Sequence, residues 1–162
     1  ARFKKYAEQI VKNSKTAASN FSKLLLSVVA GGSNTHLILV NLQNKGLIGN
    51  LAAEALEAVN IILNRNAVPF DPNPPFYPSG IRMGTPGITS RGMKEKEMKK
   101  IGEWINKIVD KAVEVKKKMN VSFEEEKKKS VRGKIIREIR EIGKVREEVK
   151  ELCRKYPVKK RY

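Results

Sequence analysis

One arginine, which lies between two glycines, is the residue of this chain whose surroundings best suit ligand binding. The stretch from 79 to 92 reads Ser-Gly-Ile-Arg-Met-Gly-Thr-Pro-Gly-Ile-Thr-Ser-Arg-Gly, and its first arginine is Arg82. A guanidinium is a planar fork of donors that matches a carboxylate or a phosphate, and adjacent glycines let a ligand approach the backbone. Two plainer roles also fit the spacing: an exposed strand residue, or one half of an internal ion pair. The stretch predicts an anion site at Arg82 and leaves both plainer roles open.

Two further segments carry groups that suit a flat, polar ligand. Asn66 ends a short apolar run, and its amide offers a donor and an acceptor to the edge of a heterocycle. Residues 67–78 contain five prolines, which excludes a helix or an interior strand and predicts a stiff, extended connection. The ring of Phe76, after Pro74 and Pro75, would form a wall for a planar group. The plainer alternatives are an asparagine that supports a turn and a polyproline ligand for an SH3-like module.

The chain has one histidine and one cysteine, which limits the chemistry of both. Because His36 has no second histidine and no cluster of carboxylates or thiols near it in sequence, no metal site is expected. We expect His36 to be a hydrogen-bonded structural residue or to support residues that contact a ligand. A lone Cys153 excludes an intrachain disulfide, fits a reducing cytosol and is most simply a small apolar residue of a terminal helix.

The net charge of +17 dominates the composition. It favours a partner such as RNA or another polyanion, so a non-enzymatic basic binding module is one hypothesis for the function. Most of the excess lies after residue 92, where a lysine-rich solvated face explains it equally well. No run of about 18 apolar residues is present, and residues 1–6 lack the apolar part of a secretory signal. We therefore expect a cytoplasmic protein without a membrane span.

Hydrophobic periodicity predicts the elements that must position Arg82 and Asn66. Apolar residues at helical spacing predict long helices on both sides of the glycine-rich middle and a short helix within it, with Asn50 as a plausible cap. Uninterrupted apolar runs bounded by turn residues predict strands. Heptad-like spacing after residue 135 indicates that the last helix packs on other elements. The expected helices are 3–25, 46–60, 93–119 and, after a charged run at 124–129, a further helix to about residue 155. The expected strands are 26–29, 36–42, 61–66 and the run around Arg82.

The stretch 79–92 resembles the signature near the C-terminus of serine hydroxymethyltransferase, an enzyme that uses pyridoxal phosphate. Other segments are similar to the same family: the Gly-Gly-Ser run before His36, the Asn-Arg-Asn strand end at 64–66, the Val-Pro-Phe-Asp-Pro-Asn-Pro-Pro-Phe loop and the terminal Leu-Cys-Arg-Lys-Tyr-Pro. The resemblance covers nearly the whole chain, with one local expansion between the last two helices. The departures from the family's pattern are Asn34, Thr35, Arg65 and Gly87.

This resemblance implies an activity and a set of contacts. The family transfers the hydroxymethyl carbon of serine to tetrahydrofolate reversibly, which gives glycine and 5,10-methylenetetrahydrofolate. By the match, Arg82 would hold the carboxylate of the amino acid, and Asn66, Pro74, Pro75 and Phe76 would lie on the folate side. Pyridoxal 5'-phosphate would be the cofactor and tetrahydrofolate the co-substrate.

The resemblance also implies that the catalytic half of the enzyme lies elsewhere. The family's Schiff-base lysine follows a histidine in a threonine-rich run, ahead of an Arg-Gly-Pro-Arg-Gly-Gly segment, and neither occurs in this sequence. We therefore expect no catalytic residue in the chain, which is identified as a C-terminal small domain of the bacterial type without the cofactor-binding large domain. It would be inactive alone, and would need a large-domain chain or a second subunit, as in the family's homodimers.

The implied fold is the small domain of a fold-type I pyridoxal-phosphate enzyme. This is an α+β, two-layer domain with a short, mainly antiparallel sheet covered by helices. The region between the last two helices is longer than is usual in the family. We expect residues 1–119 to form the small domain and residues 120–162 to form a lysine-rich helical extension that ends in the family-like terminal helix.

Overall fold

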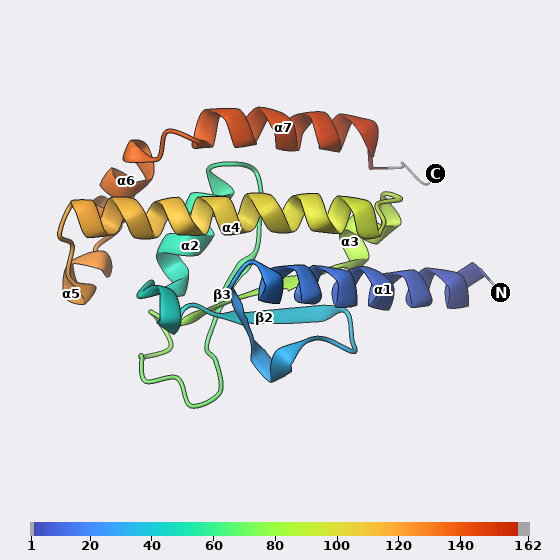
Figure 1. Cartoon of the computed structure of the whole chain (residues 1–162), viewed down its shortest axis with the longest axis horizontal. Coiled ribbons are helices and arrows are strands. Elements are labelled where there is room, and N and C mark those ends of the chain that lie inside the picture. Colours follow the sequence, from blue (N-terminus) through green and yellow to red (C-terminus); the bar gives the residue numbers. More distant parts are fainter. Residues whose placement is uncertain (1, 159–162) are drawn as a thin grey trace.

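The computed structural model describes residues 2–158 and confirms the α+β class, with helices packed on a small antiparallel sheet (Figure 1). The strands are β1 (Ser27–Val28), β2 (Leu37–Asn41), β3 (Asn64–Asn66) and β4 (Gly80–Gly84). The α-helices are α1 (Arg2–Lys23), α2 (Gly49–Glu57), α3 (Pro86–Ser90), α4 (Glu95–Lys118), α5 (Phe123–Glu126), α6 (Lys129–Glu138) and α7 (Ile142–Lys155). Two 3-10 turns, η1 (Val29–Gly31) and η2 (Gln43–Lys45), follow β1 and β2.

The strands follow the order β1-β2-β4-β3, and every neighbouring pair is antiparallel. Alternation along β4 distinguishes the two faces of the sheet, because Ile81 is buried whereas Arg82 is exposed. Ile81 pairs with Val40, which is also buried, so this face packs against the helices. Leu39 and Asn64 pair with Arg82 from its two sides and share the opposite face. The predicted strand around Arg82 is confirmed, and it is an interior strand.

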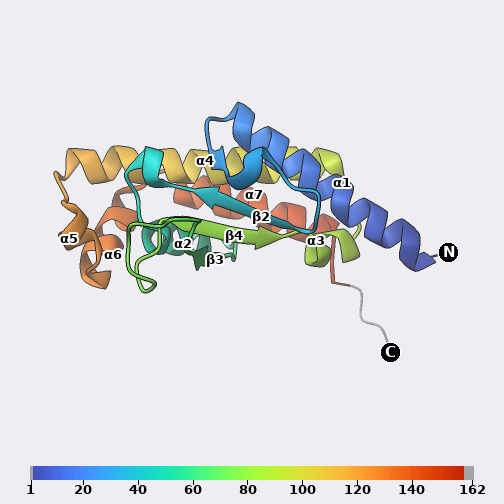
Figure 2. The ribbon, with the colours of Figure 1, turned by 90° about the horizontal axis from the view of Figure 1, so that it is seen from below.

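Helices cover one face of the sheet. In Figure 2, which views the molecule from below, β2 and β4 lie in front of α4 and α7. The core between these layers is apolar and includes Phe21 of α1, Leu56 of α2 and Ile105 of α4, which are fully buried. Helix α4 contacts α1, α2 and α6 and thereby connects the two ends of the helical layer. The amphipathic periodicity of α1 and α4 predicted this inner face.

Beyond α4, the chain was expected to continue with the charged run 124–129 and a further helix to about residue 155. It forms α5, α6 and α7, and Ile139 between the last two has an extended backbone, with φ −78° and ψ 101°. The break lets apolar residues on both sides reach the core: Ile135 before it, and Val145 and Val149 after it, are buried. The expected packing is therefore confirmed. The further helix is interrupted at Ile139 because burial of both apolar sets outweighs the helical propensity of the residues that join them.

Two smaller expectations are also wrong. Asn50 does not cap α2, because it lies buried within the helix and the cap position is Ile48, whose side chain makes no capping hydrogen bond. Of the expected strand 61–66, only β3 pairs with the sheet. Ile61 and Leu63 pack against the core instead, outside the ladder.

The predicted division at residue 119 stays a prediction. Helix α6 contacts both α2 and α4. Helix α7 is tied to α4 by a hydrogen bond that Trp104 Nε1 donates to a carboxylate oxygen of Glu148 at 2.6 Å. Residues 159–162, which end the expected extension, lie outside the described residues.

Candidate functional site

Arg82 lies in the middle of β4 on the exposed face of the sheet. None of the hydrogen bonds or ion pairs between residues 2–158 involves its guanidinium. It is an exposed strand residue, and the alternative of an internal ion pair is not found in the described part of the chain. A guanidinium with unoccupied donors keeps the capacity to bind an anion in bidentate fashion.

The register of the sheet places Asn66 near Arg82. Asn64 pairs directly with Arg82 and Asn66 pairs with Gly80, so both asparagines lie on the face of Arg82. Diagonal neighbours on one face of an antiparallel pair lie about 7 to 8 Å apart, within reach of a long side chain. The Nδ2 of Asn66 donates to the carbonyl oxygen of Ala67 at 2.7 Å, which fits the turn-supporting role. Its position beside Arg82 also fits the expected ligand role, which stays a prediction.

The glycine that begins β4 is required by close packing. A Cβ at Gly80 would lie 2.7 Å from Val68 Cγ1, 2.8 Å from the carbonyl oxygen of Asn66 and 2.9 Å from that of Val40. No side chain fits at these distances, so the absence of one lets β4 pair closely on both sides. This close pairing holds the strand that carries the arginine.

A shallow depression of about 500 Å³ opens beside Arg82 at the β3 edge of the sheet. Its lining contains opposite charges, with Arg65 and Arg82 on the strands and Glu54 and Glu57 on α2. Glu54 is already paired with Arg132, at 2.7 Å. Cationic and anionic groups around one depression suit a ligand that carries both charges, such as an amino acid.

Asp71 organises the proline-rich loop 67–78. Its carboxylate accepts hydrogen bonds from the amides of Val68 (3.1 Å), Asn73 (3.0 Å) and Ser79 (2.8 Å), and from the Ser79 hydroxyl (2.6 Å). Burial by itself raises the pKa of this carboxyl, but the hydrogen bonds together lower the pKa below its usual 3.8. The loop contains no helix or strand, as expected. Its shape is held by the Asp71 carboxylate as well as by the prolines.

The loop residues that were expected on the folate side are exposed. Pro74 and Pro75 face solvent, and Phe76 is 77% exposed. The backbone beneath the ring is held by Asn50, whose Nδ2 donates to the carbonyl oxygen of Phe76 at 3.2 Å. An exposed ring on an anchored backbone fits the expected wall, and the folate role of the three residues stays a prediction.

His36 precedes β2 with an exposed side chain. Its hydrogen bonds within residues 2–158 are made by its backbone carbonyl, which accepts from the Thr85 amide at 3.1 Å. The structure thus gives the imidazole no hydrogen-bonded structural role, and its role in supporting a ligand site stays a prediction. Within the same residues, no group of three or more His, Cys, Asp or Glu side chains is arranged to hold a metal ion.

The stretch 79–92 is anchored by contacts with α1 that sequence analysis did not assign. The Oγ1 of Thr85 donates to the carbonyl oxygen of Ile10 at 2.9 Å, and the Nδ2 of Asn13 donates to the Oγ1 of Thr89 at 2.8 Å. The turn after β4 is therefore fixed to the helical layer.

The second arginine of this stretch has a structural role that was also missed. Arg91 donates from Nε to the carbonyl oxygen of Tyr156 at 2.6 Å and from Nη2 to that of Cys153 at 2.9 Å. These carbonyls lie at the end of α7, where intrahelical partners are lacking. Because the partners lie more than sixty residues later in the chain, no local pattern announces the contact. Arg82 and Arg91 thus differ, one being open to a ligand and the other closing a helix end.

No helix within residues 2–158 has the length and apolar character needed to cross a membrane.

The chain is similar to proteins of one enzyme family. A family model described as serine hydroxymethyltransferase matches residues 1–105. The serine hydroxymethyltransferase of Koribacter versatilis is 38% identical over 156 residues, which make up 96% of this chain and 31% of the relative. That of Wigglesworthia glossinidia brevipalpis is 51% identical over 109 residues, 67% of this chain and 26% of the relative. That of Acidobacterium capsulatum is 48% identical over 103 residues, 64% of this chain and 24% of the relative.

The chain spans about a third or less of the length of these curated relatives. The part matched by the family model contains Arg82, Asn66 and the loop 67–78, whereas α5, α6 and α7 follow it. The Koribacter versatilis match covers nearly the whole chain, so most of the later segment also has a counterpart in a relative. The alternative of a basic module for RNA or another polyanion finds no support in these relatives, which all carry the name of one enzyme.

Proposed function

Because the chain belongs to the serine hydroxymethyltransferase family, we propose that it forms the C-terminal, small-domain part of such an enzyme. The whole reaction would be reversible transfer of the hydroxymethyl carbon of serine to tetrahydrofolate, giving glycine and 5,10-methylenetetrahydrofolate. This chain would bind the amino acid by its carboxylate and form one side of the folate site. The observation that carries the proposal is the open guanidinium of Arg82 on the face of the sheet that it shares with Asn66.

Arg82 is the carboxylate-binding residue in this proposal. Its strand is paired with β2 on one side and β3 on the other, so the guanidinium starts from a rigid position. Glu57 lines the same depression and supplies an acceptor that suits an ammonium group. Serine and glycine carry both charges at neutral pH, which fits this arrangement better than a purely anionic ligand does.

Asn66 and the loop residues Pro74, Pro75 and Phe76 form the folate side. The amide of Asn66 offers polar contacts to a heterocycle edge, and the exposed ring of Phe76 offers an apolar wall. The loop is held by Asp71, so the wall is largely formed before the ligand arrives. A site that is already ordered loses less conformational entropy on binding.

The residues around Arg82 do not hold pyridoxal phosphate by themselves. The cofactor needs a lysine for its Schiff base, and none lines the depression beside Arg82. Pyridoxal phosphate supplies the electron sink for bond cleavage at Cα of the amino acid. In our proposal, it is bound by a large domain in the part of the relatives that this chain does not span. The complete enzyme is a cytoplasmic homodimer.

The test joins this chain to the Koribacter versatilis relative in place of the matching 156 residues. The chimaera is expected to cleave serine in the presence of tetrahydrofolate, whereas the remaining part of the relative alone should not. Pyridoxal-phosphate absorbance measures whether the large domain is intact in both proteins. A chimaera that binds the cofactor but neither binds nor cleaves serine would overturn the proposal.

A further inference from the structure

The segment after α4 brings a buried carboxylate to the N-terminus of α2. Glu126, the last residue of α5, is 0% exposed, and its Oε1 accepts a hydrogen bond from the Ile48 amide at 3.1 Å. Ile48 is the cap residue of α2 and has an apolar side chain, so the helix takes its capping carboxylate from another element. Such a carboxylate is favoured by the helix dipole and by the free amides of the first turn.

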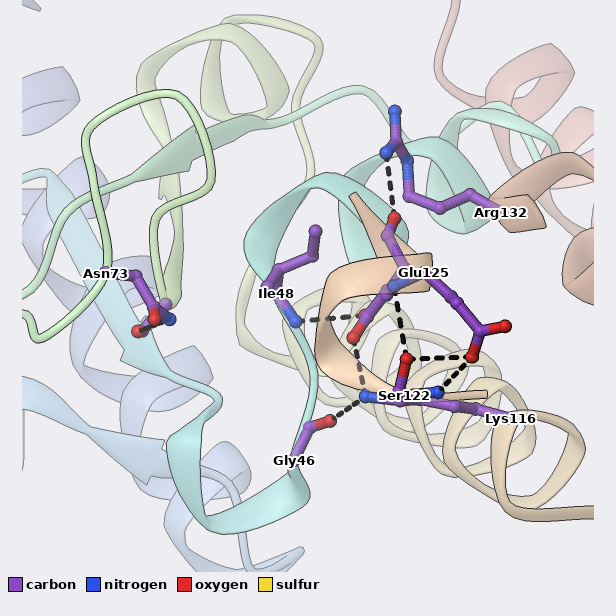
Figure 3. A network of polar contacts seen from close by, with 9 residues as sticks. Gly46, Ile48, Asn73, Lys116, Ser122, Glu125 and Arg132 are labelled. Atoms are coloured by element: carbon purple, nitrogen blue, oxygen red, sulfur yellow. Dashed lines mark hydrogen bonds and ion pairs between the residues drawn. The ribbon is translucent and has the colours of Figure 1, made fainter. Parts of the chain in front are cut away.

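Lys116 of α4 balances the charge of Glu126. Its Nζ donates to Oε2 of Glu126, and it also donates to the carbonyl oxygen of Gly46 at 2.6 Å. Arg132 of α6 donates from Nη1 to the backbone oxygen of Glu126 at 2.9 Å and thereby holds the end of α5. In Figure 3, dashed lines join Gly46 and Ile48, just before α2, to side chains that come from α4 and α5. This segment is therefore fixed from the side of α4 and α5.

The same helix end holds the loop 67–78 by two hydrogen bonds. The Gly49 amide donates to the carbonyl oxygen of Pro78 at 2.7 Å. The Nδ2 of Asn50 donates to the carbonyl oxygen of Phe76 at 3.2 Å. At this helix end, the Ile48 amide therefore binds the carboxylate of α5, and Gly49 and Asn50 hold the loop.

This part of α2 is in direct backbone contact with the loop and the start of β4. A Cβ at Gly49 would lie 2.2 Å from the carbonyl oxygen of Gly80 and 3.1 Å from that of Pro78. No flexible side chain lies between the two backbones. A shift at the N-terminus of α2 therefore passes directly to the end of the loop.

We propose that Glu126 is a positioning residue, which acts through α2 on the loop 67–78 and sets the affinity for tetrahydrofolate. The inference rests on the proposed function, in which this loop forms a wall of the folate site. Arg82 lies two residues into a strand that is paired on both sides, so its position depends on the ladder. Folate binding should therefore depend on Glu126 more strongly than serine binding does.

Two variants and one control separate this role from general stability. Glu126→Gln keeps the shape of the side chain and removes the charge opposite Lys116. The double variant Lys116→Met with Glu126→Leu removes both charges and the hydrogen bond to Ile48, and its apolar pair preserves the packing. Glu124→Gln is the matched control, because Glu124 lies in the same helix but is exposed and paired with Lys127.

The first measurement is amide hydrogen exchange on this chain. In the double variant, the amides of Gly49 and Tyr77 are expected to exchange about tenfold faster, because the helix end and the loop lose their common anchor. The Tyr77 amide is a suitable reporter since it donates within the loop, to the carbonyl oxygen of Pro74 at 2.9 Å. Amides of α7 should keep their rates, and Glu124→Gln should change neither region. Unchanged exchange at Gly49 and Tyr77 in a folded double variant would overturn the inference.

The second measurement is steady-state kinetics of the chimaera with Koribacter versatilis. Glu126→Gln and the double variant should raise KM for tetrahydrofolate about tenfold and change kcat and KM for serine by less than about threefold. Equal increases in both KM values would show a general structural loss and contradict the positioning role. A chimaera without any activity would refute the proposed function, while the exchange measurement would still decide whether Glu126 controls the loop.

Discussion

Replacing Arg132 by methionine tests whether α6 is tied to α2 as the structure shows. The side chain is 6% exposed and connects α6 with α2 and α5. Its Nε and Nη2 donate to the two carboxylate oxygens of Glu54 at 2.8 and 2.7 Å, and its Nη1 donates to the carbonyl oxygens of Glu126 and Lys127. Methionine keeps much of the aliphatic stem and removes every donor.

The size of the loss follows from the groups left behind. Two carbonyl oxygens lose a donor, and an unpaired buried acceptor costs about 1 to 3 kcal/mol. Removing one member of a buried ion pair costs about 3 to 5 kcal/mol. Because the side chain of Glu54 is 26% exposed, water recovers part of its loss. Taking the lower end of each range and this recovery into account, we expect the free energy of unfolding to fall by about 4 kcal/mol, which lowers Tm by about 8 to 16 °C at this chain length.

Thermal and urea denaturation followed by circular dichroism measure this loss. Arg137→Met is the matched control, because Arg137 lies in the same helix at an exposed position, and it should change the free energy by less than about 0.5 kcal/mol. Arg132→Met and its control should both unfold in one cooperative transition. An unchanged Tm for Arg132→Met would refute the reasoning, and two separate transitions would show that the segment after residue 119 unfolds on its own.

Three further variants test the packing at β4 and the charge in the loop. Gly80→Ala should lower the free energy of unfolding by about 1 to 3 kcal/mol, because its Cβ meets Val68 and two carbonyl oxygens. Gly87→Ala places the new Cβ with no atom within 4 Å, so it should leave the free energy of unfolding unchanged or raise it by up to about 1 kcal/mol. Thermal denaturation distinguishes the Gly80→Ala variant, with a lowered Tm, from the Gly87→Ala variant. Because hydrogen bonds lower the pKa of Asp71 below 3.8, its ionised form stabilises the fold above about pH 4, and this contribution is lost as the pH falls through the lower folded-state value. Between about pH 5 and about pH 2, the free energy of unfolding of Asp71→Asn should therefore fall less than that of the wild type. Curves of this free energy against pH that run parallel for the two proteins would contradict the prediction.

Long periodic patterns predicted the helical layer and the strand of the site. The helix expected at 93–119 corresponds to Glu95–Lys118, because its apolar residues recur over many turns. The strand around Arg82 was predictable from an apolar run bounded by glycines, and alternation then placed Ile81 inside and Arg82 outside. These features depend on neighbours along the chain.

Features that depend on distant residues were not predictable. Asn50 was a reasonable cap by local rules, but the carboxylate at that helix end comes from Glu126, 78 residues beyond Ile48. Likewise, the break at Ile139 follows from the need to bury apolar residues on both of its sides, which local helical propensity does not record. The hydrogen bonds of Arg91 were unpredictable for the same reason, since the end of α7 lies beside Arg91 only in the folded chain.

Use of serine by the chimaera, with Arg82→Lys compared against Arg65→Lys, tests the central claim most directly. Both arginines line the same depression, and both substitutions keep the positive charge. An ammonium cannot reproduce the bidentate clamp on a carboxylate, so Arg82→Lys should raise KM for serine about 30-fold or more. Arg65→Lys, at a position where the family's pattern has lysine, should stay within about twofold of the parent. Equal KM values for the two variants would contradict the assignment of the substrate carboxylate to Arg82.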